Sequence, residues 1–287
     1  MKNNSLLSHR RNEPESSILY IVGTPIGNLN DISSRALNIL KNVSYVYCED
    51  TRQTRKIMTK HKISNNLISL NKHNSQIKIP KIIDALKSEK SIAIVSDAGM
   101  PTICDPGEDI IKTVKYEGYD VICIPGPCAA ITALVSSGMP SSSFIFEGFL
   151  PKKKIDREKI LFDISKNEKT TILFESPYRL KRLLNELLEY CGEHREIEVF
   201  RELTKKFEEH IGHDILSTIK FFEGKEVLGE ITLVIKGIVK RKENEHNTAE
   251  LKKDLSELIN AGLSLSAASK YLAKRNGLKK SIIYNLN

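Results

Sequence analysis

The chain has 287 residues, of which 40% are hydrophobic and 28% are charged. These fractions are typical of a globular protein with a sizeable core, and they exclude a chain that is disordered along most of its length. The length favours two domains of ordinary size. No apolar run approaches the roughly 20 residues of a membrane-spanning helix, and only Leu6 and Leu7 precede the basic residues 9–11. We therefore expect neither a membrane span nor a secretory signal, and we expect a cytoplasmic protein.

The formal net charge of +8 is concentrated at the C-terminus. Residues 236–287 carry eleven basic and five acidic side chains, so +6 of the total lies in the last 52 residues. A nearly neutral body with a basic tail indicates a polyanionic partner that the tail helps to bind. The alternative is a solvated helical tail without a partner.

The cysteines form no C-x-x-C pair and have no histidine at a zinc-like spacing. They are Cys48, Cys104, Cys123, Cys128 and Cys191. This pattern predicts reduced, buried thiols, with no disulfide and no metal site.

Apolar strands and helices alternate along the first half of the chain. Residues 1–17 are polar and unpatterned, and we expect a disordered tail. Apolar runs predict strands at 18–22, 45–48, 67–70, 92–95 and 121–124. Helical spacing predicts helices at about 33–40, 77–86, 108–117 and 129–135. This alternation predicts βαβ units and a mostly parallel sheet in an α/β domain over residues 18–146.

A second α/β pattern follows the basic segment 151–154, and we expect a second domain over 147–237. Its predicted strands are 171–174, 197–200 and 230–235, and its predicted helix is 177–190. A charged linker then leads to a small helical domain at 250–287, broken at Gly262 and Gly277. Its basic helices resemble a helix-turn-helix pair, so we expect backbone contacts to folded RNA.

Four predicted strands end in turns that are polar or rich in glycine and proline. These turns are 23–31, 49–52, 96–107 and 125–130. Ligands of open α/β sheets bind outside the carboxyl ends of the strands, so we expect the four turns to form one crevice. Neither G-x-G-x-x-G nor G-x-x-x-x-G-K-[ST] occurs in the sequence, which argues against a Rossmann dinucleotide site or a P-loop.

Two acidic residues stand out in the turn after the strand at 92–95. Asp97 lies at the strand end beside small residues, where a carboxylate suits a ligand that carries ammonium or hydroxyl groups. Asp105 precedes a predicted helix, and its residue type favours an N-cap. We therefore interpret Asp97 as functional and Asp105 as structural.

Six stretches taken together resemble a known family. They are Thr24-Pro25-Ile26-Gly27-Asn28-Leu29, Glu49-Asp50-Thr51-Arg52, Ser96-Asp97-Ala98-Gly99, Pro125-Gly126-Pro127-Cys128-Ala129-Ala130, Phe146-Glu147-Gly148-Phe149-Leu150-Pro151 and Arg201-Glu202-Leu203-Thr204-Lys205. In this order and spacing they resemble the bacterial 16S ribosomal RNA 2′-O-methyltransferases of the tetrapyrrole-methylase superfamily. The resemblance covers residues 18 to 237, and a small C-terminal helical domain also belongs to the family pattern.

The resemblance implies two α/β domains with S-adenosylmethionine in the cleft between them, and a homodimer. The implied substrate is 16S ribosomal RNA of the small subunit, methylated on a cytidine ribose in the decoding region. The residues that match the family's cofactor positions are Pro25, Ile26, Asp97, Met100, Ala129, Ala130, Phe174, Leu203 and Thr204.

The chemistry of such a reaction requires a ribose 2′-hydroxyl that attacks a sulfonium methyl group in line, so alignment is its main demand. A base that accepts the hydroxyl proton would assist. Glu49, Asp50 and His73 are candidates for this base, and Arg52 is a candidate contact to phosphate or base. The sequence does not rank them.

Two other functions fit parts of the sequence. A tetrapyrrole or other small-molecule methyltransferase would share the crevice, but it would leave the basic tail unexplained. A non-catalytic RNA-binding protein would explain the tail, but it would not need intact crevice turns.

Overall fold

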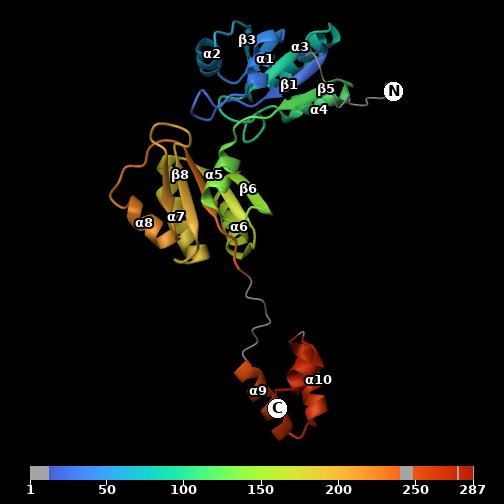
Figure 1. Cartoon of the computed structure of the whole chain (residues 1–287), viewed down its shortest axis with the longest axis vertical. Helices are drawn as coiled ribbons and strands as arrows, with labels where there is room; N and C mark the ends of the chain where they lie inside the picture. Colours follow the sequence, from blue (N-terminus) through green and yellow to red (C-terminus); the bar gives the residue numbers. More distant parts are fainter. Residues whose placement is uncertain (1–12, 240–247, 277, 287) are drawn as a thin grey trace. The chain divides into compact units, whose positions relative to one another are not determined.

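The computed structural model describes residues 13–239, 248–276 and 278–286. The chain forms two compact units, Met1–Ile238 and Val239–Asn287 (Figure 1). The first unit contains two five-stranded sheets, and we call each sheet with its helices an α/β domain. No helix within the described ranges combines the length and the apolar character needed to cross a membrane.

The first sheet is parallel throughout, with strand order β3-β2-β4-β1-β5. Its strands are β1 (Ile18–Val22), β2 (Tyr45–Cys48), β3 (Leu67–Ser69), β4 (Ile92–Val95) and β5 (Asp120–Ile124). The helices that connect them are α1 (Ser34–Asn42), α2 (Thr51–Lys60), α3 (Ser75–Lys87) and α4 (Glu108–Tyr116). All five strands predicted from apolar runs are present, and the predicted parallel sheet is confirmed.

Helices cover both faces of this sheet. Leu40 of α1 and Met58 of α2 belong to one buried cluster, and Ile82 of α3 and Val114 of α4 belong to another. Every residue of β1 is buried because the strand has neighbours on both faces, which explains its unbroken apolar sequence.

Capping side chains determine where the first helices begin. The Ser33 hydroxyl accepts a hydrogen bond from the backbone N–H of Ala36 at 3.0 Å, which caps α1. Asp105 does not cap α4, contrary to our expectation from the sequence. The N-cap of α4 is Gly107, whose φ of +136° is a conformation that favours glycine.

The second sheet is mixed, with strand order β6-β7-β10-β8-β9. Its strands are β6 (Phe144–Phe149), β7 (Thr170–Glu175), β8 (Ile197–Arg201), β9 (Glu209–Gly212) and β10 (Ile231–Ile235). β6 and β7 are parallel, whereas β10 runs antiparallel to both β7 and β8. The associated helices are α5 (Ala129–Ser137), α6 (Lys154–Lys166), α7 (Pro177–Cys191) and α8 (Ile215–Phe222).

The helix α5 packs on the second sheet, although it follows the last strand of the first. Ala133 and Leu134 of α5 share a buried cluster with Ile172 and Val234, and Ile26 from the first domain joins them. The helices α6, α7 and α8 cover the opposite face of the same sheet. The first domain and the second sheet therefore meet through α5 and Ile26.

Several expectations from the sequence are corrected by the structure. The domain boundary expected between residues 146 and 147 falls inside β6, because β6 pairs with β7 along both sides of that point. The elements β6, β9, α6 and α8 have no counterpart among the predicted elements. Of the five free thiols only Cys48 is buried, whereas Cys104 and Cys123 are exposed.

Part of the tail that we expected to be disordered is held against the first domain. Glu13 forms an ion pair with Arg35 at 2.6 Å, and the Ser17 hydroxyl donates to the carbonyl of Leu86 at 2.9 Å. Residues 1–12 lie outside the described residues.

The second unit contains α9 (Thr248–Asn260), α10 (Leu265–Arg275) and α11 (Lys280–Tyr284). Leu255, Leu272 and Ile283 are buried in a core of its own. Ser264 caps α10 by accepting from the N–H of Ala267 at 3.3 Å. The predicted helical region is thus confirmed, while the break expected at Gly277 lies outside the described residues.

Candidate active site

A cavity of about 410 Å³ lies between the two sheets of the first unit. Its lining is mostly apolar and comes from the loops after β1, β4 and β5 and from the ends of β7 and β10. The lining residues are Ile26, Ala98, Gly99, Met100, Ile103, Cys104, Asp105, Cys128, Ala129, Phe149, Phe174, Glu175, Ser176, Pro177, Phe200, Leu203, Gly229, Glu230, Ile231 and Thr232. A concave, largely apolar site of this size suits a small organic ligand.

The loops of the first domain cross each other at the mouth of their sheet. Thr24 and Gly99 exchange two backbone hydrogen bonds, of 2.9 and 3.1 Å. Gly23 packs so closely on Gly126 that a Cβ on either residue would lie within 2.8 Å of the other's backbone. Glycine is required at both positions for this close approach. The loops after β1, β4 and β5 therefore converge, as the sequence predicts, whereas the fourth predicted turn, 49–52, contributes no residue to the cavity lining.

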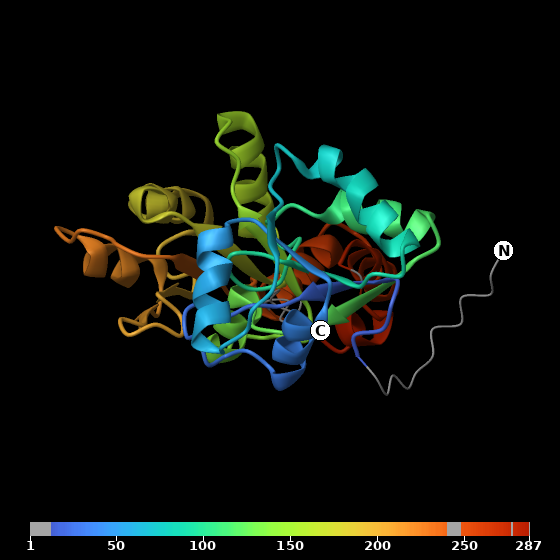
Figure 2. The ribbon, with the colours of Figure 1, turned by 90° about the horizontal axis from the view of Figure 1, so that it is seen from above.

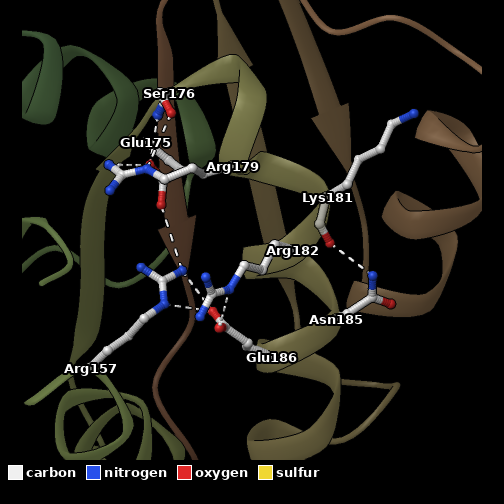
Figure 3. A network of polar contacts seen from close by, with 8 residues as sticks. All are labelled: Arg157, Glu175, Ser176, Arg179, Lys181, Arg182, Asn185 and Glu186. Atoms are coloured by element: carbon white, nitrogen blue, oxygen red, sulfur yellow. Dashed lines mark hydrogen bonds and ion pairs between the residues drawn. The ribbon is translucent and has the colours of Figure 1, made fainter. Parts of the chain in front are cut away.

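On the second domain, a buried ion-pair network holds the turn that lines the cavity (Figure 3). The Glu175 carboxylate has no exposed surface and lies 2.6 Å from Arg179 and 3.7 Å from Arg157. The same carboxylate accepts the backbone N–H of Ser176 at 2.7 Å. Arg157 also pairs with Glu186 at 2.6 Å. These contacts fix the start of α7, where Ser176 and Pro177 face the cavity.

The turn after β8 is strained and tightly held. Glu202 and Thr204 have positive φ angles of 55° and 66°, a region that side chains other than glycine rarely adopt. The Glu202 carboxylate accepts the N–H of Glu230, and the Thr204 hydroxyl accepts the N–H of Asn28 at 3.0 Å. Backbone strain that the surroundings enforce is typical of functional sites.

Three carboxylates of the first domain act on one another, and one of them, Asp105, lines the cavity. Burial raises the pKa of Glu49, and the nearby charges of Asp105 and Asp97 raise it further. Burial also raises the pKa of Asp97 and of Asp105. The charge of Lys72 opposes the shifts at Glu49 and Asp105. These half-buried carboxylates are therefore stronger bases than solvated ones.

The structure gives the four predicted catalytic residues different surroundings. Asp50 caps α2 by accepting from the N–H of Arg52 at 2.8 Å, and it pairs with the Arg52 guanidinium at 2.7 Å. These hydrogen bonds lower the pKa of Asp50. His73 is exposed in the turn before α3, and its backbone N–H donates to the side-chain oxygen of Asn71. Of the four, only Glu49 is a half-buried carboxylate with a raised pKa.

The predicted cofactor residues divide in a similar way. Ile26, Met100, Ala129, Phe174 and Leu203 line the cavity. Pro25, Ala130 and Thr204 are sequence neighbours of lining residues but do not belong to the lining. Asp97 also lies outside the lining, and its carboxylate accepts the backbone N–H of Asp50 at 2.9 Å.

Sequence reasoning missed several lining residues. Asp105 lines the cavity, although we had interpreted it as a helix cap. Glu230 also enters from the second domain. The stretch 174–177 has a charged residue at a strand end and proline at a helix start, a pattern from which we expect it to line the crevice from the second domain, and all four of its residues belong to the lining. Among the residues that the structure describes, no three His, Cys, Asp or Glu side chains are grouped to hold a metal ion.

Comparison of the sequence with known proteins yields a consistent set of relatives. Residues 18–219 match the family model described as tetrapyrrole (corrin/porphyrin) methylases. The chain is 40% identical to the ribosomal RNA small subunit methyltransferase I of Bacillus subtilis, over 94% of each chain. It is 45% identical to the protein of that name from Thermotoga maritima, over 76% of this chain and 98% of the relative.

Solved structures share the fold at low sequence identity. A cobalt precorrin-4 methyltransferase of cobalamin biosynthesis superimposes with a TM-score of 0.60 at 17% identity, covering 77% of this chain and 95% of that one. A uroporphyrin-III C-methyltransferase from Thermus thermophilus, in complex with S-adenosylhomocysteine, gives a TM-score of 0.53 at 14% identity, over 76% and 96% of the two chains.

Proposed function

Because the chain belongs to the tetrapyrrole (corrin/porphyrin) methylase family, we propose that it methylates the 2′-hydroxyl of a cytidine ribose in the decoding region of 16S ribosomal RNA. The observation that carries the proposal is the likeness, over nearly the whole chain, to proteins named ribosomal RNA small subunit methyltransferase I. The proposed substrate implies a cytoplasmic protein.

The broader class of activity, which the sequence predicts, is confirmed. The chain is a methyltransferase, and its methyl donor is S-adenosylmethionine. The predicted fold of two α/β domains and a C-terminal helical region is confirmed as well. A non-catalytic RNA-binding protein is therefore excluded.

The cavity fits the methyl donor by size and by chemistry. Its volume is within the range of small-molecule sites, and its apolar walls would hold the uncharged parts of the cofactor. Ile26, Met100, Ala129, Phe174 and Leu203 would hold it, and Asp105 would face the polar groups. When bound, the cofactor supplies a methyl group activated by a sulfonium. Asp97 would orient the turn at residues 49–50 through its hydrogen bond to Asp50.

We assign the proton acceptor to the Glu49 carboxylate. It is half-buried, and Asp97 and Asp105 raise its pKa, so it accepts a proton more readily than a solvated carboxylate. Asp50 caps α2 and His73 is exposed at the surface, so neither is assigned this role. Arg52, whose side chain is 87% exposed, is available for a phosphate contact.

The proposal is tested by methyl transfer from labelled S-adenosylmethionine to small ribosomal subunits that lack the modification, followed by mapping of the labelled nucleotide. We expect label on one cytidine ribose of the decoding region. Label at another nucleotide would refute the position, and label on neither subunits nor free 16S ribosomal RNA would refute the substrate.

The alternative of a tetrapyrrole substrate is less well supported. The tetrapyrrole methyltransferases among the solved structures are 14–17% identical to this chain, whereas the ribosomal RNA methyltransferases are about 40% identical. At 17% identity a structural likeness carries information on the fold and none on the substrate.

We further propose that the C-terminal unit contributes to RNA binding. Its described residues include seven basic and three acidic side chains, on helices with a core separate from the first unit. Deletion of residues 240–287 should weaken binding to 16S ribosomal RNA at moderate salt and leave the affinity for S-adenosylmethionine unchanged. Filter binding and calorimetry measure the two affinities, and an unchanged RNA affinity would contradict the proposal.

A homodimer is also proposed. Ile131 and Val135 of α5 are 44% and 72% exposed, and Phe144 of the outer strand β6 is 38% exposed. Exposed apolar side chains on an outer strand and a neighbouring helix favour association. Sedimentation equilibrium should give about twice the chain mass of 32.4 kDa, and a monomer at micromolar concentration would contradict this.

A further inference from the structure

The exposed face of α2 carries only positive charge. Residues 51–62 include five basic side chains and no acidic one. Thr54, Ile57 and Met58 face the core, and the basic side chains lie on the exposed side of the helix and just beyond its end. They are Arg52, Arg55, Lys56, Lys60 and Lys62. Figure 2 shows α2, in light blue, at the surface of the first domain.

These charges are poorly compensated within the chain. Arg52 pairs with Asp50, and Lys56 donates to the amide oxygen of Gln53 at 2.8 Å. In the part of the chain that the structure describes, no carboxylate pairs with Arg55, Lys56 or Lys60. Arg52 and Lys56, and then Lys56 and Lys60, are like charges four residues apart, which destabilises a helix. This spacing favours a partner that supplies negative charge.

A groove of about 540 Å³ continues this surface at the end of α2. Its lining combines amide and ammonium groups without any acidic residue: Gly27, Asn28, Leu29, Asn30, Lys60, Thr204, Lys205 and Lys206. Lys205 is held by Glu202 and Glu230, each at 2.9 Å. The exposed Lys60 and Lys206 leave the groove positively charged.

The groove adjoins the active-site cavity. Ile26 lines the cavity, and the next residue, Gly27, lines the groove. Likewise, Leu203 lines the cavity and Thr204 lines the groove. At its other end, α2 begins directly after Glu49 and Asp50. Ten helical residues span about 15 Å, a length over which a nucleic acid strand carries several phosphates.

We propose that the exposed face of α2 and this groove form one track for the phosphate backbone of the RNA on one side of the methylated nucleotide. Lys56 and Arg55 would contact phosphates along the helix, and Lys60 and Lys206 would contact them in the groove. Such contacts position the RNA without reading its sequence. This inference rests on the proposed function and adds the surface by which the substrate is held.

The test compares two triple variants of the full chain that lose the same charge. One is Arg55→Gln, Lys56→Gln, Lys60→Gln on α2. The control is Lys81→Gln, Lys87→Gln, Lys115→Gln, which alters exposed residues of α3 and α4. Binding to unmodified 16S ribosomal RNA transcript is measured from 0.05 to 0.3 M salt, together with affinity for S-adenosylmethionine and thermal unfolding.

For the α2 variant we expect an affinity for RNA at least about tenfold lower than that of the control. The slope of log affinity against log salt should become less steep by about 2, because each of the three lost phosphate contacts on a single strand contributes about 0.7. Cofactor affinity and unfolding temperature should match those of the control. If the α2 variant binds RNA with the affinity and slope of the control, the track is refuted. If the unmodified chain methylates neither the transcript nor small subunits, the proposed function fails, and the track fails with it.

Discussion

Replacing Glu49 with glutamine should lower the rate of methyl transfer by about 10²- to 10⁴-fold, the usual contribution of a positioned proton acceptor. The amide keeps the shape of the side chain but cannot accept the hydroxyl proton. The affinity for S-adenosylmethionine should stay close to that of the unmodified chain, because Glu49 lies outside the cavity lining. Single-turnover rates with labelled cofactor, together with a cofactor titration, measure both effects.

The pH dependence of the rate provides an independent measure of the same role. Only the deprotonated carboxylate acts as the base, so the rate should fall as the pH drops through the pKa of Glu49. Burial raises that pKa and the neighbouring Asp105 and Asp97 raise it further, so this fall should begin at a higher pH than for a solvated glutamate. The glutamine variant should lack this limb of the profile.

Asp50→Asn is the matched control for Glu49→Gln. It removes one negative charge at the adjacent position, and asparagine caps a helix about as well as aspartate. The α2 cap should survive, and the rate should remain within a few-fold of normal. Near-normal turnover of Glu49→Gln, with cofactor affinity intact, would remove Glu49 from the mechanism.

Replacing Glu175 with glutamine should lower the free energy of unfolding by about 3–5 kcal/mol. The Glu175 side chain is fully buried between Arg157 and Arg179, and Arg157 is itself 3% exposed (Figure 3). Loss of the carboxylate charge removes the partner of Arg179 and leaves the buried Arg157 guanidinium with Glu186 as its one remaining carboxylate partner among the described residues. Urea unfolding followed by circular dichroism measures the change.

Arg182→Gln provides the control within the same network. Arg182 also pairs with Glu186, at 2.9 Å, but its side chain is 62% exposed. Exposed ion pairs contribute less than about 1 kcal/mol, so this variant should unfold almost as the unmodified chain does. Equal effects of the two substitutions would mean that burial does not govern the strength of this network.

Much of the first sheet could be predicted from the sequence because its strands are short, mostly apolar and separated by helices with clear apolar spacing. β1 and β4 consist of buried residues only. β6 was missed because a bulge between Phe146 and Gly148 interrupts its alternation. α6 was missed because it buries an arginine, Arg157, on the face where an apolar residue is expected.

The candidate site could be predicted from the sequence only in part, for a different reason. The converging turns follow from strand order, and the family resemblance identified Ile26 and Phe174 among the lining residues. The structure was needed to place Asp105 in the cavity lining and Asp97 outside it, because both lie in one loop and only the folded backbone decides which of them reaches the cavity. Glu175 is at least 70 residues away from either.

The position of β10 in the second sheet determines how late in synthesis the enzyme can acquire its site. All strands of the first sheet have been made by residue 124, and each pairs with neighbours within that segment. In the second sheet, β7 and β8 do not pair with each other. Both pair with β10, which is synthesised only at Ile231–Ile235. Until then β6–β7 and β8–β9 are separate pairs of strands with unpaired inner edges. A nascent chain thus completes its first domain early, and it cannot hold the methyl donor until the ribosome has translated most of the message.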